Sequence, residues 1–167
     1  MEKTPKEKPS AMDRALHYIG YRMRTEKELS DYLAKKEYDS GEIDEVLTRL
    51  KEYGYVDDMA FCREYILQRI AQRPVGKRKL EYDLIKKGIP KETIQACMLE
   101  YDPKEEQNQC NALAQRLLAR KGTDKKAIQS VQRTLVGRGF SYDICKNAIA
   151  IAVREREDVC EDEYYDY

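Results

Sequence analysis

Hydrophobic residues recur three and four positions apart along most of the chain, which is the spacing of α-helices that bury one face. Ile43, Val46, Leu47 and Leu50 show this spacing most clearly. No segment shows the strict alternation of apolar and polar residues that is typical of a half-buried strand. The pattern therefore predicts an all-α protein.

Capping residues and glycines divide this pattern into short helices. The first helix is expected from Ala11 to Arg22, with Ala15, Leu16 and Ile19 on its inner face. Thr25 and Glu28 then predict a capping box at the start of the second helix. Later helices are predicted to begin at Asp39 or Ser40, at Asp57 or Asp58, at Asp102-Pro103 and at Ser141, and to end at Gly54, Gly88, Gly122 and Gly139.

The whole pattern recurs at a spacing of about 51 residues. At this spacing the apolar residues align in five sets: Ala15, Ile66 and Leu117; Leu16, Leu67 and Leu118; Leu29, Leu80 and Val131; Leu33, Leu84 and Leu135; Tyr38, Ile89 and Phe140. Gly88 and Gly139 also align, and Glu37 takes their place in the first copy. We therefore predict three tandem three-helix repeats at residues 11–55, 56–102 and 103–156 that form an elongated, curved array. Residues 1–10 and the acidic tail 157–167 are expected to be disordered.

Composition narrows the class of protein. The sequence contains no apolar run long enough for a transmembrane helix, and its charged start does not resemble a secretory signal. Five widely spaced cysteines favour reduced thiols, so we expect a cytoplasmic protein. The net charge is zero, but six of the 31 acids lie in 157–167, which leaves residues 1–156 with a charge of +6. That basic body is compatible with an anionic partner.

The sequence offers little for catalysis, and we expect a protein that is not an enzyme and needs no cofactor or metal. His17 is the one histidine and is expected to be a partly exposed helix residue. Gly137-Arg138-Gly139 is interpreted as a helix end and not as a phosphate loop, because it follows a helical pattern. Asp57-Asp58 is interpreted as a pair that caps a helix and not as a metal site.

Basic residues gather in the middle of the chain. Between Arg69 and Lys87 there are seven Lys or Arg residues and two acids, Glu81 and Asp83. A solvated surface with salt bridges is one interpretation, and a surface for an anionic partner is the other. We favour the second, because two acids do not neutralise seven bases. The predicted partner-binding residues are Arg63, Arg69, Arg73, Lys77, Arg78, Lys79, Lys86 and Lys87.

The same stretch carries a family resemblance. Gly54-Tyr55-Val56-Asp57-Asp58, Phe61, Tyr65, Arg69, Gly76, Leu80, Leu84 and Lys87-Gly88-Ile89 together resemble the signature of the RecX family of bacterial recombinase regulators. The resemblance covers about residues 11–155. It implies a cytoplasmic, non-enzymatic protein of recombinational DNA repair and the SOS response that binds the RecA–DNA filament and inhibits RecA.

Three hypotheses of function follow. The first is a monomeric RecA regulator that binds the filament, with possible direct contact to DNA. The second is a stand-alone helical module that binds nucleic acid, whose mark would be a steep salt dependence of binding to naked DNA. The third, a generic helical scaffold for another protein, is less favoured because it accounts for neither the basic cluster nor the signature.

Overall fold

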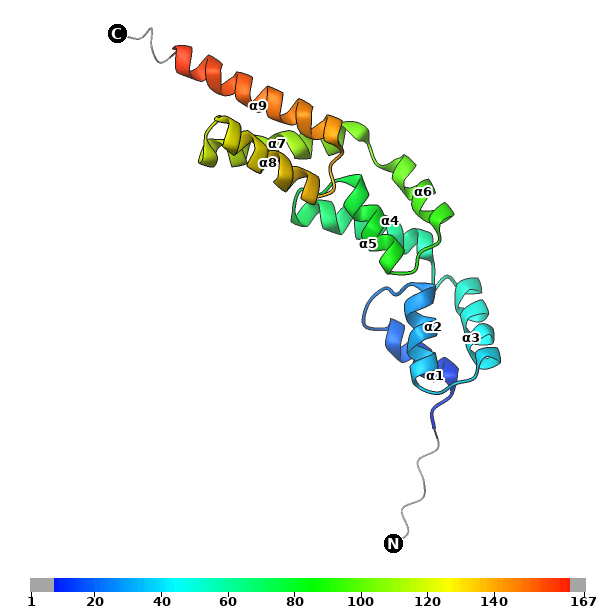
Figure 1. Cartoon of the computed structure of the whole chain (residues 1–167). Coiled ribbons are helices and arrows are strands. Elements are labelled where there is room, and N and C mark those ends of the chain that lie inside the picture. Colours follow the sequence, from blue (N-terminus) through cyan, green and yellow to red (C-terminus); the bar gives the residue numbers. More distant parts are fainter. Residues whose placement is uncertain (1–7, 163–167) are drawn as a thin grey trace. The chain divides into compact units, whose positions relative to one another are not determined.

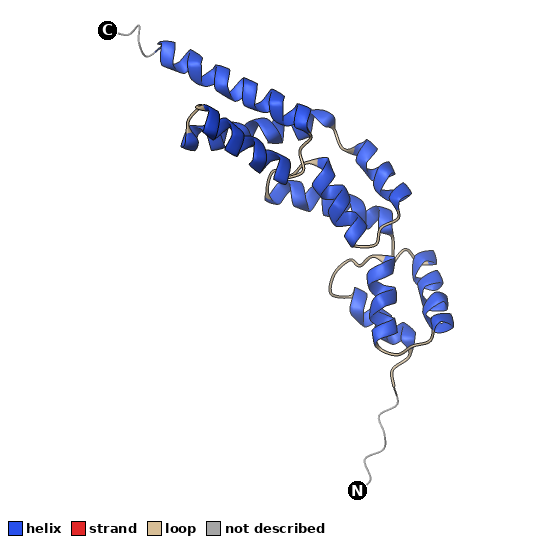
Figure 2. Cartoon of the chain, in the orientation of Figure 1, coloured by secondary structure: helices blue, strands red, loops and turns tan. Residues whose placement is uncertain are grey.

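The computed structural model describes residues 8–162, and within them the backbone forms nine α-helices and no strand (Figures 1 and 2). The predicted all-α class and the three tandem three-helix repeats are confirmed. The helices are α1 (Ala11–Ile19), α2 (Glu26–Lys35), α3 (Ser40–Glu52), α4 (Asp58–Gln72), α5 (Lys77–Lys86), α6 (Lys91–Glu100), α7 (Pro103–Lys121), α8 (Lys125–Gly137) and α9 (Tyr142–Asp162).

The ends of the chain were expected to be disordered. Residues 1–7 and 163–167 lie outside the described residues. Ser10 caps α1, where its hydroxyl accepts the Asp13 N–H at 3.0 Å. At the other end, α9 continues past Arg156 to Asp162 and so enters the acidic segment.

Side-chain caps set most helix starts. Thr25 caps α2, as predicted, by accepting the Glu28 N–H at 3.0 Å, and the Glu28 carboxylate also pairs with Arg22 and Lys87. A complete capping box lies at α3, between Asp39 and Glu42.

The first helix also differs from its prediction. α1 ends at Ile19, where we expected Arg22. Leu16 was placed on the inner face of this helix, but it is 42% exposed. Consecutive helical residues point about 100° apart, so burial of Ala15 against α2 and α3 turns Leu16 toward solvent.

Three aligned positions adopt the same unusual backbone conformation. Glu37, Gly88 and Gly139 follow the second helix of each repeat, and their φ angles are 61°, 79° and 89°. This left-handed conformation lets the chain leave a helix sharply, and glycine adopts it without steric cost. The repeat therefore keeps its turn geometry even where the first copy has glutamate.

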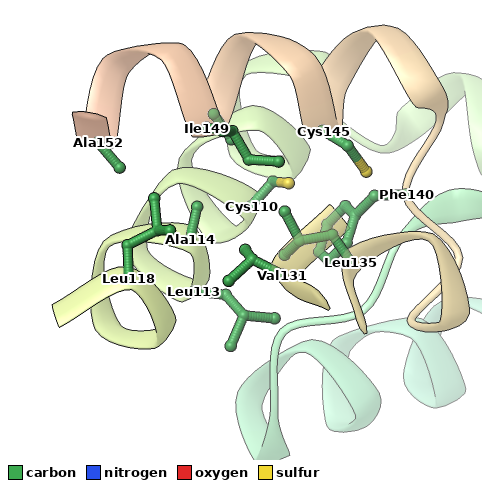
Figure 3. Packing of buried hydrophobic residues seen from close by; sticks show 11 residues of the cluster. Cys110, Leu113, Ala114, Leu118, Val131, Leu135, Phe140, Cys145, Ile149 and Ala152 are labelled. Carbon is green, nitrogen blue, oxygen red and sulfur yellow. The ribbon is translucent and has the colours of Figure 1, made fainter. Parts of the chain in front are cut away.

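The buried side chains gather between the three helices of a repeat. In the last repeat, residues of α7, α8 and α9 point toward one another, and the fully buried Phe140 packs at one end of this cluster (Figure 3). The first repeat has a comparable core around Leu29, Leu33 and Leu50. Cys62, Cys97, Cys110 and Cys145 are buried, so these four cysteines serve as small core residues.

The described residues form two compact units. One contains the residues up to Glu64 together with Leu84–Ile94, and the other contains Tyr65–Asp83 and the residues from Gln95 onward. The division passes through the middle repeat, so its helices contribute to both units. The elongated, curved arrangement stays a prediction.

Each unit holds one junction between consecutive repeats, and the two junctions use equivalent hydrogen bonds. In the first, the Thr25 hydroxyl donates to the Lys87 carbonyl at 2.8 Å, and in the second the Gly76 N–H donates to the Arg138 carbonyl at 2.9 Å. A carboxylate of the following repeat then accepts the first N–H of the second helix. Asp58 accepts from Glu26 at 2.9 Å, and Glu106 accepts from Lys77 at 2.8 Å.

Candidate partner-binding surface

The structure assigns the eight predicted basic residues to two groups. Arg63, Lys86 and Lys87 belong to the unit that contains the first repeat. The other five, Arg69, Arg73, Lys77, Arg78 and Lys79, belong to the unit that contains the last repeat.

One carboxylate neutralises two of the predicted cations. Asp83 on α5 accepts from Lys79 Nζ at 2.7 Å and lies 3.5 Å from Arg69 Nη2 on α4. The Tyr65 hydroxyl donates to the same carboxylate at 3.3 Å. The side chains of Arg69 and Asp83 are 18% and 14% exposed, so this network ties α4 to α5. Burial, followed by the charge of Asp83, raises the pKa of Tyr65, which keeps the phenol protonated.

The start of α5 presents a mixture of tied and exposed cations. The Lys77 ammonium lies 5.3 Å from the centre of the Tyr101 ring, and the backbone N–H of Lys77 donates to the buried Glu106 carboxylate. Arg73 and Arg78 are exposed, and no carboxylate among the described residues pairs with either. Of the five predicted residues in this unit, Arg73 and Arg78 are thus best placed to meet a partner.

Lys87 belongs to the junction between the first two repeats. Its ammonium lies 3.4 Å from Glu28 and 5.5 Å from the centre of the Phe61 ring, and its side chain is 27% exposed. Glu28 also pairs with Arg22 at 3.1 Å. Although burial opposes the change, hydrogen bonding to Arg22 and the charges of Lys87 and Arg22 lower the pKa of Glu28. Arg63 and Lys86 are exposed in the same unit.

A second group of cations, missed by the sequence analysis, lies on the first repeat. We call it the tyrosine-braced cluster, because each of its four cations contacts a tyrosine. Lys8, Arg24 and Lys36 lie over the rings of Tyr38, Tyr18 and Tyr32, and Arg14 is hydrogen-bonded with Tyr38 and Tyr32.

The rings and cations of the tyrosine-braced cluster form a layered arrangement. Tyr18 and Tyr32 stack with centroids 3.9 Å apart and planes 4° from parallel. Arg24 lies 4.0 Å from the Tyr18 centroid, and Lys36 lies 5.8 Å from the Tyr32 centroid. The sequence contains two weak signals for this cluster. Arg14 and Tyr18 are four residues apart, as are Tyr32 and Lys36, and this spacing places the two members of each pair on one side of a helix.

Metal ligands, the histidine, the glycine pair at the end of α8 and long apolar helices are the other features that could mark a site. No group of three His, Cys, Asp or Glu side chains in this part of the chain could hold a metal ion. His17 is exposed, and its Nε2 lies 3.2 Å from the Tyr21 hydroxyl. Gly137-Arg138-Gly139 ends α8, as predicted. None of the helices in residues 8–162 combines the length and hydropathy needed to cross a membrane.

Asp57 and Asp58 have separate roles. Asp57 caps α4 by accepting the N–H groups of Met59 and Ala60 at 2.9 and 3.0 Å. Asp58 instead accepts the Glu26 N–H across the junction, so the two do not act as the predicted capping pair. Burial, which is the largest cause, raises the pKa of Asp58, and the nearby charge of Glu26 acts in the same direction.

Three models of one family match the chain in succession. They are the first, second and third three-helix domains of RecX, and they match residues 11–50, 57–98 and 104–149. These three ranges fall within the three repeats described above.

Named relatives and solved structures agree with these matches. The chain is 32% identical over 136 residues to a regulatory protein RecX of Oceanobacillus iheyensis, covering 80% of this chain and 50% of that protein. It is 30% identical over 146 residues to a regulatory protein RecX of Listeria welshimeri, covering 86% of this chain and 54% of the relative. The chain therefore spans about half the length of the curated relatives it matches.

The fold is similar to that of a crystal structure of RecX from Lactobacillus salivarius. The TM-score is 0.81 at 25% identity, with 85% of this chain and 94% of that chain covered. A second crystal structure, of a regulatory protein RecX, gives a TM-score of 0.76 at 25% identity and covers 83% of this chain and 70% of the other.

Proposed function

The chain belongs to the RecX family, and on that premise we propose that it is a cytoplasmic, non-enzymatic regulator that binds the RecA–DNA filament and inhibits RecA during recombinational repair. The observation that carries the proposal is the succession of three RecX three-helix domains over residues 11–149. A single three-helix match would fit many helical proteins, whereas three in order identify an array.

The arrangement of charge supports an extended contact with an anionic filament. Cations without carboxylate partners among the described residues occur in both units, at Arg14 and Arg24 in one and at Arg73 and Arg78 in the other. Several weak contacts on one chain act at high effective concentration, so they give a useful affinity together. Such binding needs no catalytic group.

A sedimentation experiment tests the proposal. RecA filaments assembled on single-stranded DNA are pelleted with the full chain, and naked DNA of the same length is the parallel sample. We expect the chain to pellet with the filament at concentrations that leave it free of naked DNA at the same salt. Equal binding to both would favour the alternative, a stand-alone nucleic-acid-binding module.

Arg73 and Arg78 give a sharper test of the predicted surface. We expect R73E/R78E to weaken filament binding by about tenfold or more, because two exposed charges are reversed while the core is untouched. The matched control is K125E/K126E, which makes the same change in charge at two exposed lysines of α8. Equal loss in both variants would show that net charge, and not this surface, decides the binding.

A further inference from the structure

The tyrosine-braced cluster stands out by its lack of negative charge. Most other cations of the first repeat have a carboxylate partner: Arg22 pairs with Glu28, Lys27 with Asp31, Arg49 with Glu45 and Lys51 with Glu26. By contrast, no carboxylate among residues 8–156 lies within salt-bridge distance of any of the four cations in the cluster: Lys8, Arg14, Arg24 and Lys36.

Three of the four cations, Lys8, Arg14 and Arg24, are also held in place. The Nε atoms of Arg14 and Arg24 are shielded from solvent, so both guanidinium groups lie against the protein. Hydrogen bonding with Tyr38, the largest cause, raises the pKa of Arg14. The Lys8 ammonium lies 4.1 Å from the Tyr38 centroid and donates to the Glu37 carbonyl at 2.8 Å. Fixing charged side chains in advance lowers the entropy lost when a ligand binds.

The tyrosine rings of the cluster are occupied by their own neighbours. Tyr18 has Arg24 on one face and Tyr32 on the other, and the Tyr38 hydroxyl donates to the Pro9 carbonyl at 2.5 Å. The apolar Leu16 lies on a different side of α1 from Arg14 and Tyr18, because residues two apart on a helix point in nearly opposite directions. The cluster therefore offers positive charge and N–H donors but little apolar surface.

This combination favours a phosphate backbone over a protein partner. Protein interfaces need an apolar, desolvated core to provide most of their affinity. Contacts with nucleic acid are made largely by Arg and Lys to phosphate oxygens, and their free energy comes mainly from release of counterions. Arginine also matches the geometry of a phosphate through two parallel hydrogen bonds.

We propose that the tyrosine-braced cluster on the first repeat is a binding surface for the phosphodiester backbone of nucleic acid. This surface lies outside the predicted basic stretch from Arg63 to Lys87. It acts on DNA directly, so it neither requires the proposed action on RecA nor fails with it.

The test measures binding of the full chain to a fluorescent oligo(dT) and to a hairpin duplex, without RecA, between 50 and 200 mM salt. Over this interval, four phosphate contacts on a single strand, each contributing a slope of about 0.7, lower the affinity about fiftyfold. The cluster variant is K8Q/R14Q/R24Q/K36Q. The matched control, K91Q/K104Q/K125Q/K126Q, removes the same charge from exposed lysines elsewhere. Comparing the affinity for oligo(dT) with that for the hairpin shows whether the cluster binds the phosphates of single-stranded or of duplex DNA.

We expect the cluster variant to lose at least tenfold in affinity at the lowest salt, and its salt slope on oligo(dT) to flatten by about 2 to 3, since each lost phosphate contact on a single strand contributes about 0.7. The control should change the slope by about 1 or less. Circular dichroism of each variant checks the fold. The milder K8Q/K36Q keeps both guanidinium groups on the protein and should still flatten the slope by about 1.

Three results would overturn the proposal. The first is an unchanged slope in the cluster variant, and the second is an equal loss in the cluster and control variants. The third is that the native chain binds poly-glutamate but neither oligonucleotide, and that the cluster variant loses the binding to poly-glutamate. That result would assign the surface to an acidic protein.

Discussion

At the scale of single residues, the left-handed turn after the second helix is where sequence and conformation disagree most. Gly88 and Gly139 suit this backbone, but Glu37 adopts it with φ at 61°. A side chain in this region costs about 1–2 kcal/mol, because Cβ approaches the following carbonyl. Only the alignment of Glu37 with Gly88 and Gly139 indicates a left-handed turn at this position, since glutamate by itself gives no such signal.

Glu37→Gly should therefore stabilise the protein. We expect a gain of about 0.5–1 kcal/mol in the free energy of unfolding, because relief of the steric cost exceeds the extra entropy of glycine in the unfolded chain. Urea unfolding followed by circular dichroism measures the gain. Glu37→Ala keeps the strained backbone and is the control; an E37G protein no more stable than E37A would contradict this explanation.

Asp58 gives a prediction about pH. Its folded pKa is raised, so the ionised carboxylate is less favourable in the folded protein than in the unfolded chain. This cost is present above the folded pKa and disappears as the pH falls through it. Asp58→Asn keeps an oxygen that can accept the Glu26 N–H, so we expect it to be at least as stable as the native chain at pH 7, with an advantage that shrinks as the pH falls through the raised pKa of Asp58.

Asp58→Ala is the comparison for this test. It removes the acceptor as well as the charge, and we expect it to lose about 1–2 kcal/mol at every pH. Thermal unfolding of both variants at pH 7 and pH 4 distinguishes the two effects. If D58N lost as much stability as D58A at pH 7, the charge itself would be stabilising and the assignment would be wrong.

The charge partners show what sequence could and could not predict at this scale. Lys79 and Asp83 are four residues apart on one helix, so their pairing could be read from spacing. The contact of Arg69 with the same carboxylate joins two helices and has no local signal. The four cations of the tyrosine-braced cluster are spread over residues 8–36, so no charge run marks them.

At the scale of elements, helices were predicted well where apolar spacing and caps agree. The start of α3 after Asp39 and the end of α8 before Gly139 follow from these signals. The junctions could not be predicted, although their residues align at the repeat spacing. Thr25 and Gly76 are chemically unlike, yet both donate to a carbonyl of the next repeat, one through its hydroxyl and one through its N–H. Apolar matching does not detect such backbone contacts.

Gly76 is the tightest point of the second junction. A Cβ added there would lie 2.3 Å from backbone atoms of Gly139 and Phe140. Gly76→Ala should thus force the two segments apart and cost about 1–3 kcal/mol, which a shift in the urea midpoint would record.

Gly137→Ala is the matched control for Gly76→Ala. An added Cβ at Gly137 meets no atom within 4 Å, and the residue is the last of α8. We expect this variant to be unchanged or more stable by up to about 1 kcal/mol, because alanine favours the helix. Equal stability of G76A and G137A would show that the junction is not tightly packed.

At the scale of the whole molecule, the three repeats explain the family match better than any single motif does. The first and last repeats each have a small core, and consecutive repeats share equivalent junctions, so the array is stabilised by neighbours as repeat proteins are. The sequence period predicted this organisation because apolar residues in register must serve equivalent cores. The partner could not be predicted in the same way, because exposed charge fits several anionic surfaces.

The rate of ATP hydrolysis by RecA on single-stranded DNA tests the central claim most directly. The full chain is added to preassembled filaments at a salt concentration where it leaves naked DNA unbound, with K125E/K126E as the charge-matched control for R73E/R78E. We predict that the native chain and the control lower the rate in a concentration-dependent way, and that R73E/R78E does so at least tenfold less effectively. A rate that stays constant at saturating concentrations of the native chain would contradict its assignment as a RecA regulator.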